Sequence, residues 1–321
     1  MRPFALICLL LVLVPSLASA QRPIRQLFPL RAYTLLDYQP VEFTEAFALP
    51  ASMEAASYAG VAVNARDNLV ILSRGTPTFL EFEKDGSFVR SFGADGLFAR
   101  SHGLHIDKDN NIWATDVNDH VVMKLDSDGN VLMTIGTKGA TGEWDEAAGN
   151  RLFSEPNDVA LDSMGNIYVV QGHGGNLPRV FKFSPTGEFI KQWGSRGYAP
   201  GQFVTAHAIE IDANDVLHVA DRENMRVQRF DTEGNMLREW KFDAMVCALY
   251  LHSDGYMYIT TGFDGEVAKV DMDGNVLGAT GSPGEGNGQF GEAHALTLDS
   301  ANNIYIGDVI LRRIQKFAKI Q

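Results

Sequence analysis

The sequence is short of cysteine, of positive charge and of long apolar runs. Only Cys8 and Cys247 are cysteines among 321 residues, and Lys plus Arg number 27 against 40 Asp plus Glu. The formal net charge of −13 leaves no basic face for a phosphate backbone, so a nucleic-acid partner is not expected. Helical periodicity is nearly absent as well, which indicates an all-β fold.

The N-terminus has the features of a secretory signal peptide. Arg2 is its positive start, residues 4–14 are its apolar stretch, and Ala18-Ser19-Ala20 fits a cleavage site. The apolar stretch is shorter than the roughly 20 residues that a membrane span needs, and no other segment approaches that length. We therefore expect residues 1–20 to be removed and the protein to be secreted or periplasmic. Cys247 is then the sole remaining cysteine, so no disulfide can form within the chain.

One pattern recurs six times: an apolar strand, a turn of the type Asp-x-x-(Gly/Asn)-Asn, a second strand, and further short strands separated by Asp/Gly/Asn turns. The copies start 40 to 55 residues apart, at Gly60, Gly103, Asp158, Ala208, Ala248 and Ala295. This spacing suits four strands per unit and predicts a six-bladed β-propeller. We expect residues 39–321 to form this single domain, with residues 21–38 as a lead-in. The last copy ends after its third strand, so a segment near residues 41–49 is expected to supply the fourth.

The first strand of every propeller blade lines the central channel, so residues at one repeat position form a ring. The residue just before each first strand is, in blade order, Ala59, His102, Asn157, His207, Cys247 and His294. Histidine thus occupies alternate blades, which lie about 120° apart in a six-fold ring. A single channel histidine is usually only a hydrogen-bonded polar residue, but three in one register predict a metal centre. Three histidines with an open position are typical of catalytic Zn²⁺ and also suit other divalent transition metals.

A second register lies at the end of the second strand, where blades one and four carry Arg74 and Arg222. These blades face each other, so the two guanidinium groups could hold a carboxylate beside the metal. The alternative is that each arginine pairs with a carboxylate of the blades, and Glu223 directly follows Arg222. Aspartates in the same register are expected to bond neighbouring backbone: Asp116, Asp221 and Asp308.

A glycine-rich loop in blade three, Gly172-His173-Gly174-Gly175-Asn176, places one more histidine near the channel mouth. His173 is a candidate general base or acid, the alternative being a loop histidine without a role. Cys247 shares the ring register and could approach the metal, although a small buried residue is the more common case. The other histidines are interpreted as strand or surface residues: His105, His120, His218 and His252.

These residues carry a family resemblance. The chain resembles NHL-repeat propellers and, more specifically, the peptidyl-α-hydroxyglycine α-amidating lyase (peptidylamidoglycolate lyase) family. The matching segments are residues 69–75 (LVILSRG), 101–117 (SHGLHIDKDNNIWATDV), 200–212 (PGQFVTAHAIEID), 219–230 (VADRENMRVQRF) and 292–308 (EAHALTLDSANNIYIGD). The resemblance implies that His102, His207 and His294 bind zinc and that Arg74 and Arg222 are active-site arginines.

The chain departs from that family at two positions. The resemblance implies a structural Ca²⁺ bound by the carbonyls of Val61 and Leu104 and by an aspartate after the third histidine, but that residue is Ala295 here. Losing the charged ligand weakens the expectation of calcium. The family's catalytic tyrosine would lie in the blade-three loop, where this chain has His173. The disulfides of the animal enzymes are absent too.

The resemblance implies an exported metal-dependent lyase. Its reaction cleaves the C–N bond of a peptidyl-α-hydroxyglycine, a carbinolamide bearing a carboxylate, to give an amide and glyoxylate. One alternative is a propeller hydrolase or lactonase, which typically holds Ca²⁺ with Asn, Asp and Glu side chains. Among the six ring residues only Asn157 is of these types, which counts against this alternative. Another is a non-catalytic propeller that binds a carboxylate ligand, a peptide or a protein. A monomer is expected in each case.

Overall fold

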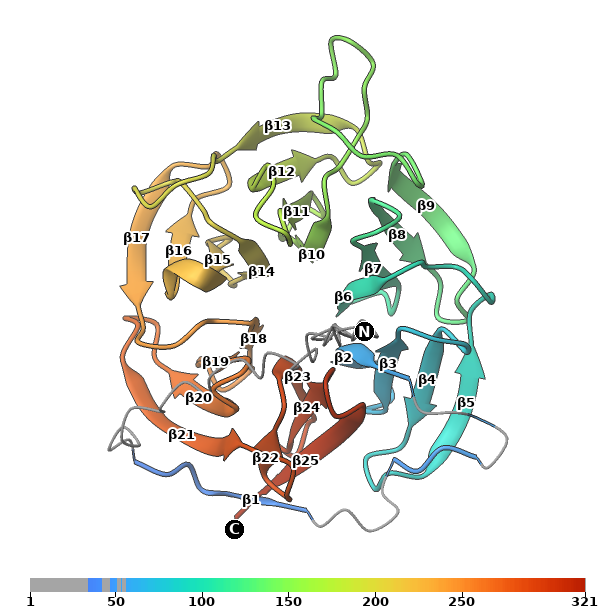
Figure 1. Cartoon of the computed structure of the whole chain (residues 1–321), viewed down its shortest axis with the longest axis vertical. Coiled ribbons are helices and arrows are strands. Elements are labelled where there is room, and N and C mark those ends of the chain that lie inside the picture. Colours follow the sequence, from blue (N-terminus) through green and yellow to red (C-terminus); the bar gives the residue numbers. More distant parts are fainter. Residues whose placement is uncertain (1–33, 42–46, 51–52, 54–55, 321) are drawn as a thin grey trace, which may run out of the picture. The chain divides into compact units, whose positions relative to one another are not determined.

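The computed structural model describes residues 34–41, 47–50, 53 and 56–320, which form six sheets around one axis (Figure 1). The predicted all-β six-bladed propeller is therefore confirmed. The predicted leader, residues 1–20, lies outside the described residues, as does most of the lead-in. No helix in the described part of the chain is both long and apolar enough to cross a membrane.

Each blade is an antiparallel sheet whose first strand faces the axis. Blade one comprises β2 (Tyr58–Val63), β3 (Leu69–Ser73), β4 (Phe79–Phe82) and β5 (Phe88–Phe92). Blade two comprises β6 (Ser101–Ile106), β7 (Ile112–Asp116), β8 (Val121–Leu125) and β9 (Val131–Gly136). Blade three comprises β10 (Pro156–Leu161), β11 (Ile167–Gln171), β12 (Arg179–Phe183) and β13 (Phe189–Trp193). Blades four and five comprise β14 (Ala206–Ile211), β15 (Leu217–Asp221), β16 (Arg226–Phe230), β17 (Met236–Lys241); β18 (Ala248–Leu251), β19 (Met257–Thr260), β20 (Glu266–Val270), β21 (Val276–Pro283) and the short parallel β22 (Gln289–Phe290). A 3₁₀ turn, η1 (Arg222–Asn224), follows β15.

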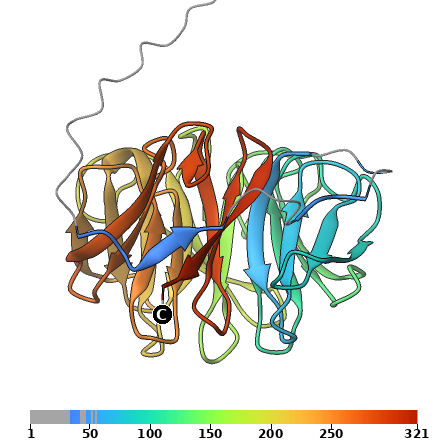
Figure 2. The same ribbon diagram turned by 90° about the horizontal axis from the view of Figure 1, so that it is seen from below.

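Blade six is completed by a strand from the other end of the chain. Its strands are β23 (Ala293–Leu298), β24 (Ile304–Asp308), β25 (Arg313–Lys319) and β1 (Tyr38–Pro40), and β1 pairs antiparallel with β25 (Figure 2). The prediction of an N-terminal fourth strand is correct, but the strand precedes the expected segment at residues 41–49. Pairing β25 with β1 covers an edge that would otherwise be free to pair with another chain.

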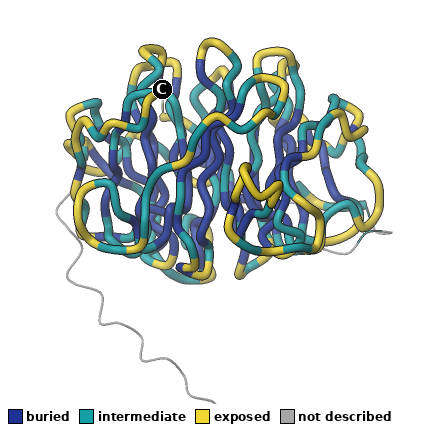
Figure 3. Tube along the Cα trace, turned by 90° about the horizontal axis from the view of Figure 1, so that it is seen from above, coloured by how far each residue is buried: buried dark blue, intermediate teal, exposed yellow. Residues whose placement is uncertain are grey.

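The apolar core lies between neighbouring blades rather than in one central cluster. Six clusters of buried side chains each join two adjacent sheets, such as the one that packs Trp113 and Val122 of blade two against Phe153 and Phe181 of blade three. Figure 3 shows the result, with buried strands inside and exposed loops on both faces. The axial cavities are lined by the ring histidines and buried acids together with apolar residues of the inner strands such as Val61, Leu104 and Leu249.

The repeated Asp-x-x-(Gly/Asn)-Asn turn joins the first two strands and anchors a side chain in the second. In blade three, Asp162 accepts backbone hydrogen bonds from Met164 and Asn166 and also accepts the hydroxyl of the fully buried Tyr168 at 3.1 Å. The same contact, six residues apart, recurs in three other blades: Asp107–Trp113, Asp212–His218 and Asp299–Tyr305. His218 is thus a structural strand residue, as interpreted from the sequence.

Further along the inner strands from the ring position, the channel contains buried acids. A cavity of about 250 Å³ is lined by residues that include Asp158, Glu210 and His105. Burial raises the pKa of Asp158 to about 7, and burial together with the charge of Asp158 raises the pKa of Glu210 to about 8. The folded protein therefore keeps protons on these acids at pH values where the unfolded chain has lost them.

We predict that Asp162→Ala lowers the free energy of unfolding by about 2–4 kcal/mol, because the buried Tyr168 hydroxyl and the turn amides lose their acceptor. The matched control is Asp126→Ala. Asp126 makes the same backbone bonds in an outer turn, with no buried aromatic partner among its hydrogen bonds, and should cost about 1 kcal/mol. Urea denaturation of the two variants measures the difference; equal losses would contradict the role given to the aromatic contact.

We also predict a pH dependence of stability. Since the folded pKa values of Asp158 and Glu210 are raised, the free energy of unfolding should fall as the pH rises from about 4 through 7 to 8. Asp158→Asn, which keeps the neutral form, should flatten this fall by at least about 1 kcal/mol at pH 8, whereas exposed Glu188→Gln should not. Denaturation curves between pH 5 and 9 provide the measurement. If the free energy of unfolding of Asp158→Asn fell with pH as steeply as that of the wild type, the prediction would be wrong.

Candidate metal centre and active site

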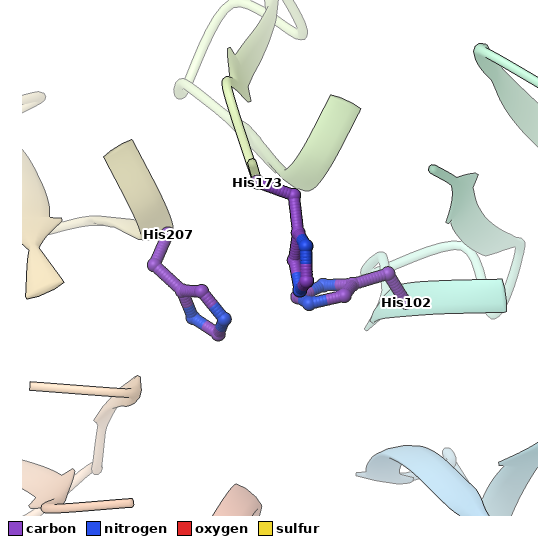
Figure 4. A group of neighbouring side chains, drawn as sticks. All are labelled: His102, His173 and His207. Carbon is purple, nitrogen blue, oxygen red and sulfur yellow. The ribbon is translucent and has the colours of Figure 1, made fainter. Parts of the chain in front are cut away.

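The residues of the predicted ring stand at irregularities of the inner strands. The strand register shifts between Tyr58 and Gly60, Ser101 and Leu104, Pro156 and Asp158, Ala206 and Ala208, and Ala293 and Ala295. The extra residues therefore include Ala59, His102, Asn157, His207 and His294. A bulge redirects a side chain out of the strand's alternation. Figure 4 shows the rings of His102 and His207 projecting into the channel from their strands.

Each ring histidine is oriented by the backbone of the next blade. Nδ1 of His102 lies 2.9 Å from the carbonyl oxygen of Asn157, that of His207 lies 2.6 Å from that of Cys247, and that of His294 lies 2.9 Å from that of Ala59. The carbonyls accept, so Nδ1 carries the proton and Nε2 is left with a free lone pair. Gly103 permits the first contact, because a Cβ there would lie 2.5 Å from the Asn157 oxygen.

The three rings converge on the axis above a cavity of about 60 Å³. Ring centroids are 4.8 Å apart for His102 and His207, 4.7 Å for His102 and His294, and 5.3 Å for His207 and His294. Because a zinc–nitrogen bond is about 2.0–2.1 Å long, two imidazoles on one ion have centroids roughly 4.5–5.2 Å apart between a right angle and the tetrahedral angle. The ring spacings are close to this range, but each of the two groups of potential ligand atoms that lie within 4.8 Å of one another contains only two of the three ring histidines.

Unsatisfied atoms in this region also fit a ligand. Nε2 of His102, Nε2 of His207 and Oδ1 of Asn157 are buried and have no hydrogen-bond partner. A buried polar atom without a partner is costly, and a divalent ion would satisfy both imidazole nitrogens. Two groups of potential metal ligands share His207: one adds His102 and His173, the other Cys247 and His294. Within each group the ligand atoms lie within 4.8 Å of one another.

Electrostatics keeps the histidines neutral, the form that binds metals. Burial and the neighbouring histidines hold the pKa of His102 well below its usual value; burial and Arg222 do the same for His207. Burial, followed by the charge of Arg74, lowers the pKa of His294 to about 3. Burial raises the pKa of the Cys247 thiol to about 12, so this residue is a neutral thiol in the absence of metal.

The two predicted arginines lie beside the centre but differ in their partners. Arg222 forms an ion pair with Glu223 through Nε at 2.8 Å and Nη2 at 2.6 Å, which is the structural alternative considered from the sequence. Arg74 donates Nε to the backbone oxygen of Ser101, and burial lowers its pKa to about 10. The three aspartates of this register bond backbone amides as expected: Asp116, Asp221 and Asp308.

His173, which was predicted to lie beside the channel mouth, contacts the ring histidines. Its ring centroid lies 4.8 Å from that of His102 and 5.8 Å from that of His207. Burial, followed by the charges of Arg222, Arg100 and Arg74, lowers its pKa to about 3. The residue therefore belongs to the histidine cluster itself.

Two charged residues near the centre were not anticipated. The charge of Arg100 lowers the pKa of Arg74, His173 and Glu292. Glu292 is 8% exposed, and burial raises its pKa, whereas the charges of Arg222 and Arg74 lower it. Both residues stand two positions before a ring histidine. That register was not compared between repeats, although it would have revealed them.

The predicted calcium ligands, Val61 and Leu104, stand two residues after the ring position on their strands. Val61 and Leu104 line the axial cavity, as does Ala295, which supplies no charge. The carboxylate at the register of Ala295 is Asp158 of blade three, which accepts the amides of Val159 and Ile209. Calcium at Val61 and Leu104 remains a prediction.

Comparison with known proteins supports the fold and indicates the relatives. A family model described as a 6-bladed beta-propeller matches residues 151–272. Peptidyl-glycine alpha-amidating monooxygenase A of Xenopus laevis is 30% identical over 310 residues, covering 83% of this chain and 32% of the frog protein. The chain thus spans about a third of the length of that relative.

Two shorter relatives match about half of the chain. A probable peptidyl-alpha-hydroxyglycine alpha-amidating lyase of Caenorhabditis elegans is 35% identical over 51% of this chain and 45% of its own length. Human NHL repeat-containing protein 3 is 32% identical over 56% of this chain and 54% of its own length.

Solved structures agree on the architecture. A gluconolactonase from Xanthomonas campestris superposes with a TM-score of 0.62 at 17% identity, covering 91% of this chain and 99% of the other. A streptogramin B lyase superposes with a TM-score of 0.60 at 12% identity, covering 87% and 97%. At these identities the likeness shows the fold alone. The chain is a six-bladed β-propeller whose relatives, at about 30% identity, include peptidyl-α-hydroxyglycine α-amidating lyases and NHL-repeat proteins.

Proposed function

We propose that the protein is a metal-dependent lyase that cleaves the C–N bond of peptidyl-α-hydroxyglycine-like carbinolamides to an amide and glyoxylate. The observation that carries the proposal is the set of three axial histidines, each with Nδ1 bonded to the next blade and Nε2 left for a metal. The amidating enzymes among the relatives support the same reaction class. We further propose that residues 1–20 direct export to the periplasm or the exterior.

The proposed metal is Zn²⁺ or another divalent transition ion held by His102, His207 and His294. When bound, it would supply a Lewis acid that polarises the substrate hydroxyl. These histidines act mainly by fixed orientation, since each Nδ1–carbonyl bond sets both the tautomer and the ring plane. They bring no positive charge of their own, so the charge of the ion is not opposed by protonated imidazole.

The substrate carboxylate is assigned to Arg74. Its Nε is bonded to the backbone of Ser101, which anchors the guanidinium, and no carboxylate among the described residues forms an ion pair with it. Arg222 is anchored by Glu223 and would orient the same carboxylate from the opposite blade. Charge-assisted bonds of this kind are strong in a buried site. The acidic protein as a whole would repel an anion, so these arginines must create the local attraction.

The remaining requirement is a base for the hydroxyl proton. His173 is neutral because burial and the nearby arginines lower its pKa, and it lies against His102. As the C–N bond breaks, its electron pair passes to the amide nitrogen, which takes up a proton, while the carbinol carbon becomes the aldehyde of glyoxylate. His173 can accept the first proton and return one to nitrogen.

One observation favours a second candidate, a propeller hydrolase or lactonase. The unpartnered Oδ1 of Asn157 and the buried Glu292 are oxygen ligands of the kind that Ca²⁺ prefers. The three histidine nitrogens in one register argue against it, because nitrogen ligands suit Zn²⁺ and related metals. A non-catalytic binding propeller is the third reading and predicts neither reaction.

We predict that the purified chain holds about one zinc ion and releases glyoxylate from an α-hydroxyhippurate-type substrate, and that His207→Ala loses both. The matched control is His252→Ala, whose imidazole bonds to Asn302 and belongs to neither group of potential metal ligands. Metal mass spectrometry and a glyoxylate assay provide the readouts, with circular dichroism to confirm folding. Calcium with ester cleavage would instead support the hydrolase, and zinc without turnover a binding protein.

We predict that Arg74→Gln lowers kcat/KM by about 10- to 100-fold, because a charge-assisted bond to the substrate carboxylate contributes about 1.5–3 kcal/mol. The control is Arg66→Gln in an exposed turn of the same blade, which should leave the kinetics unchanged. Steady-state kinetics test both. A wild-type value in Arg74→Gln would remove Arg74 from the substrate site.

A further inference from the structure

His173 is held near the axis by a loop that the blade fixes at several points. Gly172 and Gly175 take φ of 113° and 76°, a backbone conformation that suits glycine, and the amide of Gly175 donates to the oxygen of Gly172 at 2.8 Å. The amide of Gly174 donates to Glu155 Oε2 at 2.6 Å, and Arg196 donates to the oxygen of Gly175. The loop therefore places the imidazole by specific bonds on both sides of it.

The position reached is that of a ligand. The ring of His173 is 4.8 Å from the ring of His102, the same spacing as that between His102 and His207. Figure 4 shows the three rings directed at one another from two inner strands and the blade-three loop. The ligand atoms of His102, His173 and His207 lie within 4.8 Å of one another. Nitrogens on one tetrahedral zinc are about 3.3 Å apart, so binding requires the ligand nitrogens of His102, His173 and His207 to approach one another by up to about 1.5 Å.

We propose that His173 is a fourth nitrogen ligand of the metal, which closes the coordination shell until a substrate displaces it. The inference rests on the proposed function, since it requires a metal at His102, His207 and His294. Closed four-ligand shells are typical of structural zinc, whereas catalytic zinc keeps a position open. A ligand that stands on a loop outside the inner strands reconciles the two, because rotation of the His173 side chain can take the imidazole off the metal while the bonds of the loop backbone stay in place.

The inference is compatible with the role of base proposed above for His173. An imidazole that is off the metal would have a free lone pair for the carbinol hydroxyl proton, and it would return that proton to the amide nitrogen as the C–N bond breaks with its electron pair passing to nitrogen. The products would be the amide and glyoxylate, with His173 neutral again.

Cobalt substitution tests the inference without relying on turnover. Four-coordinate Co²⁺ absorbs visible light more strongly than Co²⁺ with added water ligands. We expect the full chain loaded with Co²⁺ to show the strong four-coordinate bands. In His173→Ala we expect weaker bands and at least about 10-fold weaker metal binding in a chelator competition, which is about 1.4 kcal/mol. Added imidazole should restore the bands in His173→Ala.

The controls separate this inference from loss of folding. His252→Ala should retain both the spectrum and the affinity of the wild type, because its imidazole bonds to Asn302. His173→Gln provides a second variant at the same loop position, and circular dichroism checks that both are folded. A wild-type spectrum and affinity in folded His173→Ala and His173→Gln would overturn the inference, as would a wild-type chain that binds neither Co²⁺ nor Zn²⁺.

The two proposals fail in different ways. If the Co²⁺ spectrum depends on His173 but no glyoxylate is formed, the ligand assignment stands and the lyase proposal fails. If glyoxylate is formed and the spectrum is independent of His173, the lyase proposal stands and His173 acts as a base without binding the metal.

Discussion

The site depends on the contact between each axial histidine and the backbone of the following blade. The Nδ1 bonds run from blade two to three, four to five and six to one, and the last joins residues 235 positions apart in sequence. A histidine is therefore oriented only when its blade and the next are packed together. The closing pair of β1 and β25 completes blade six, which supplies His294. Closure of the ring and orientation of the axial histidines are thus coupled.

Charge is distributed in a way that suits an anionic ligand. The chain as a whole carries −13, yet Arg74, Arg100 and Arg222 gather around the neutral histidines. Glu223 and Glu292 offset part of this positive charge, and burial strengthens every remaining interaction. Further along the inner strands, the pKa of Asp158 is raised to about 7 and that of Glu210 to about 8, so these two acids carry less negative charge at neutral pH than exposed carboxylates would. Local burial, rather than net charge, sets the electrostatics of the axis.

The six-fold arrangement turns a repeat position into a ring, so the sequence predicted that His102, His207 and His294 would gather at the axis, and the structure brings their rings together. Their role as metal ligands, and the roles of Arg74 and Arg222, stay predictions. Arg100 and Glu292 lie outside the two repeat positions that carry the histidines and the arginine pair. The contacts of His173 with the cluster could not be predicted either, because that residue belongs to an irregular loop whose position depends on bonds to Glu155 and Arg196 that no repeat pattern contains.

The sequence by itself determined the all-β class, the six blades and the histidine ring. Each follows from period-two alternation, repeat spacing or register, which are properties of the chain read along its length. Only the tertiary structure decided which nitrogen of each histidine is free, that Arg222 is held by Glu223, and that His173 joins the cluster. The physical reason is that these features arise from bulges, carbonyl directions and loop bonds between blades, which form only after the ring has closed.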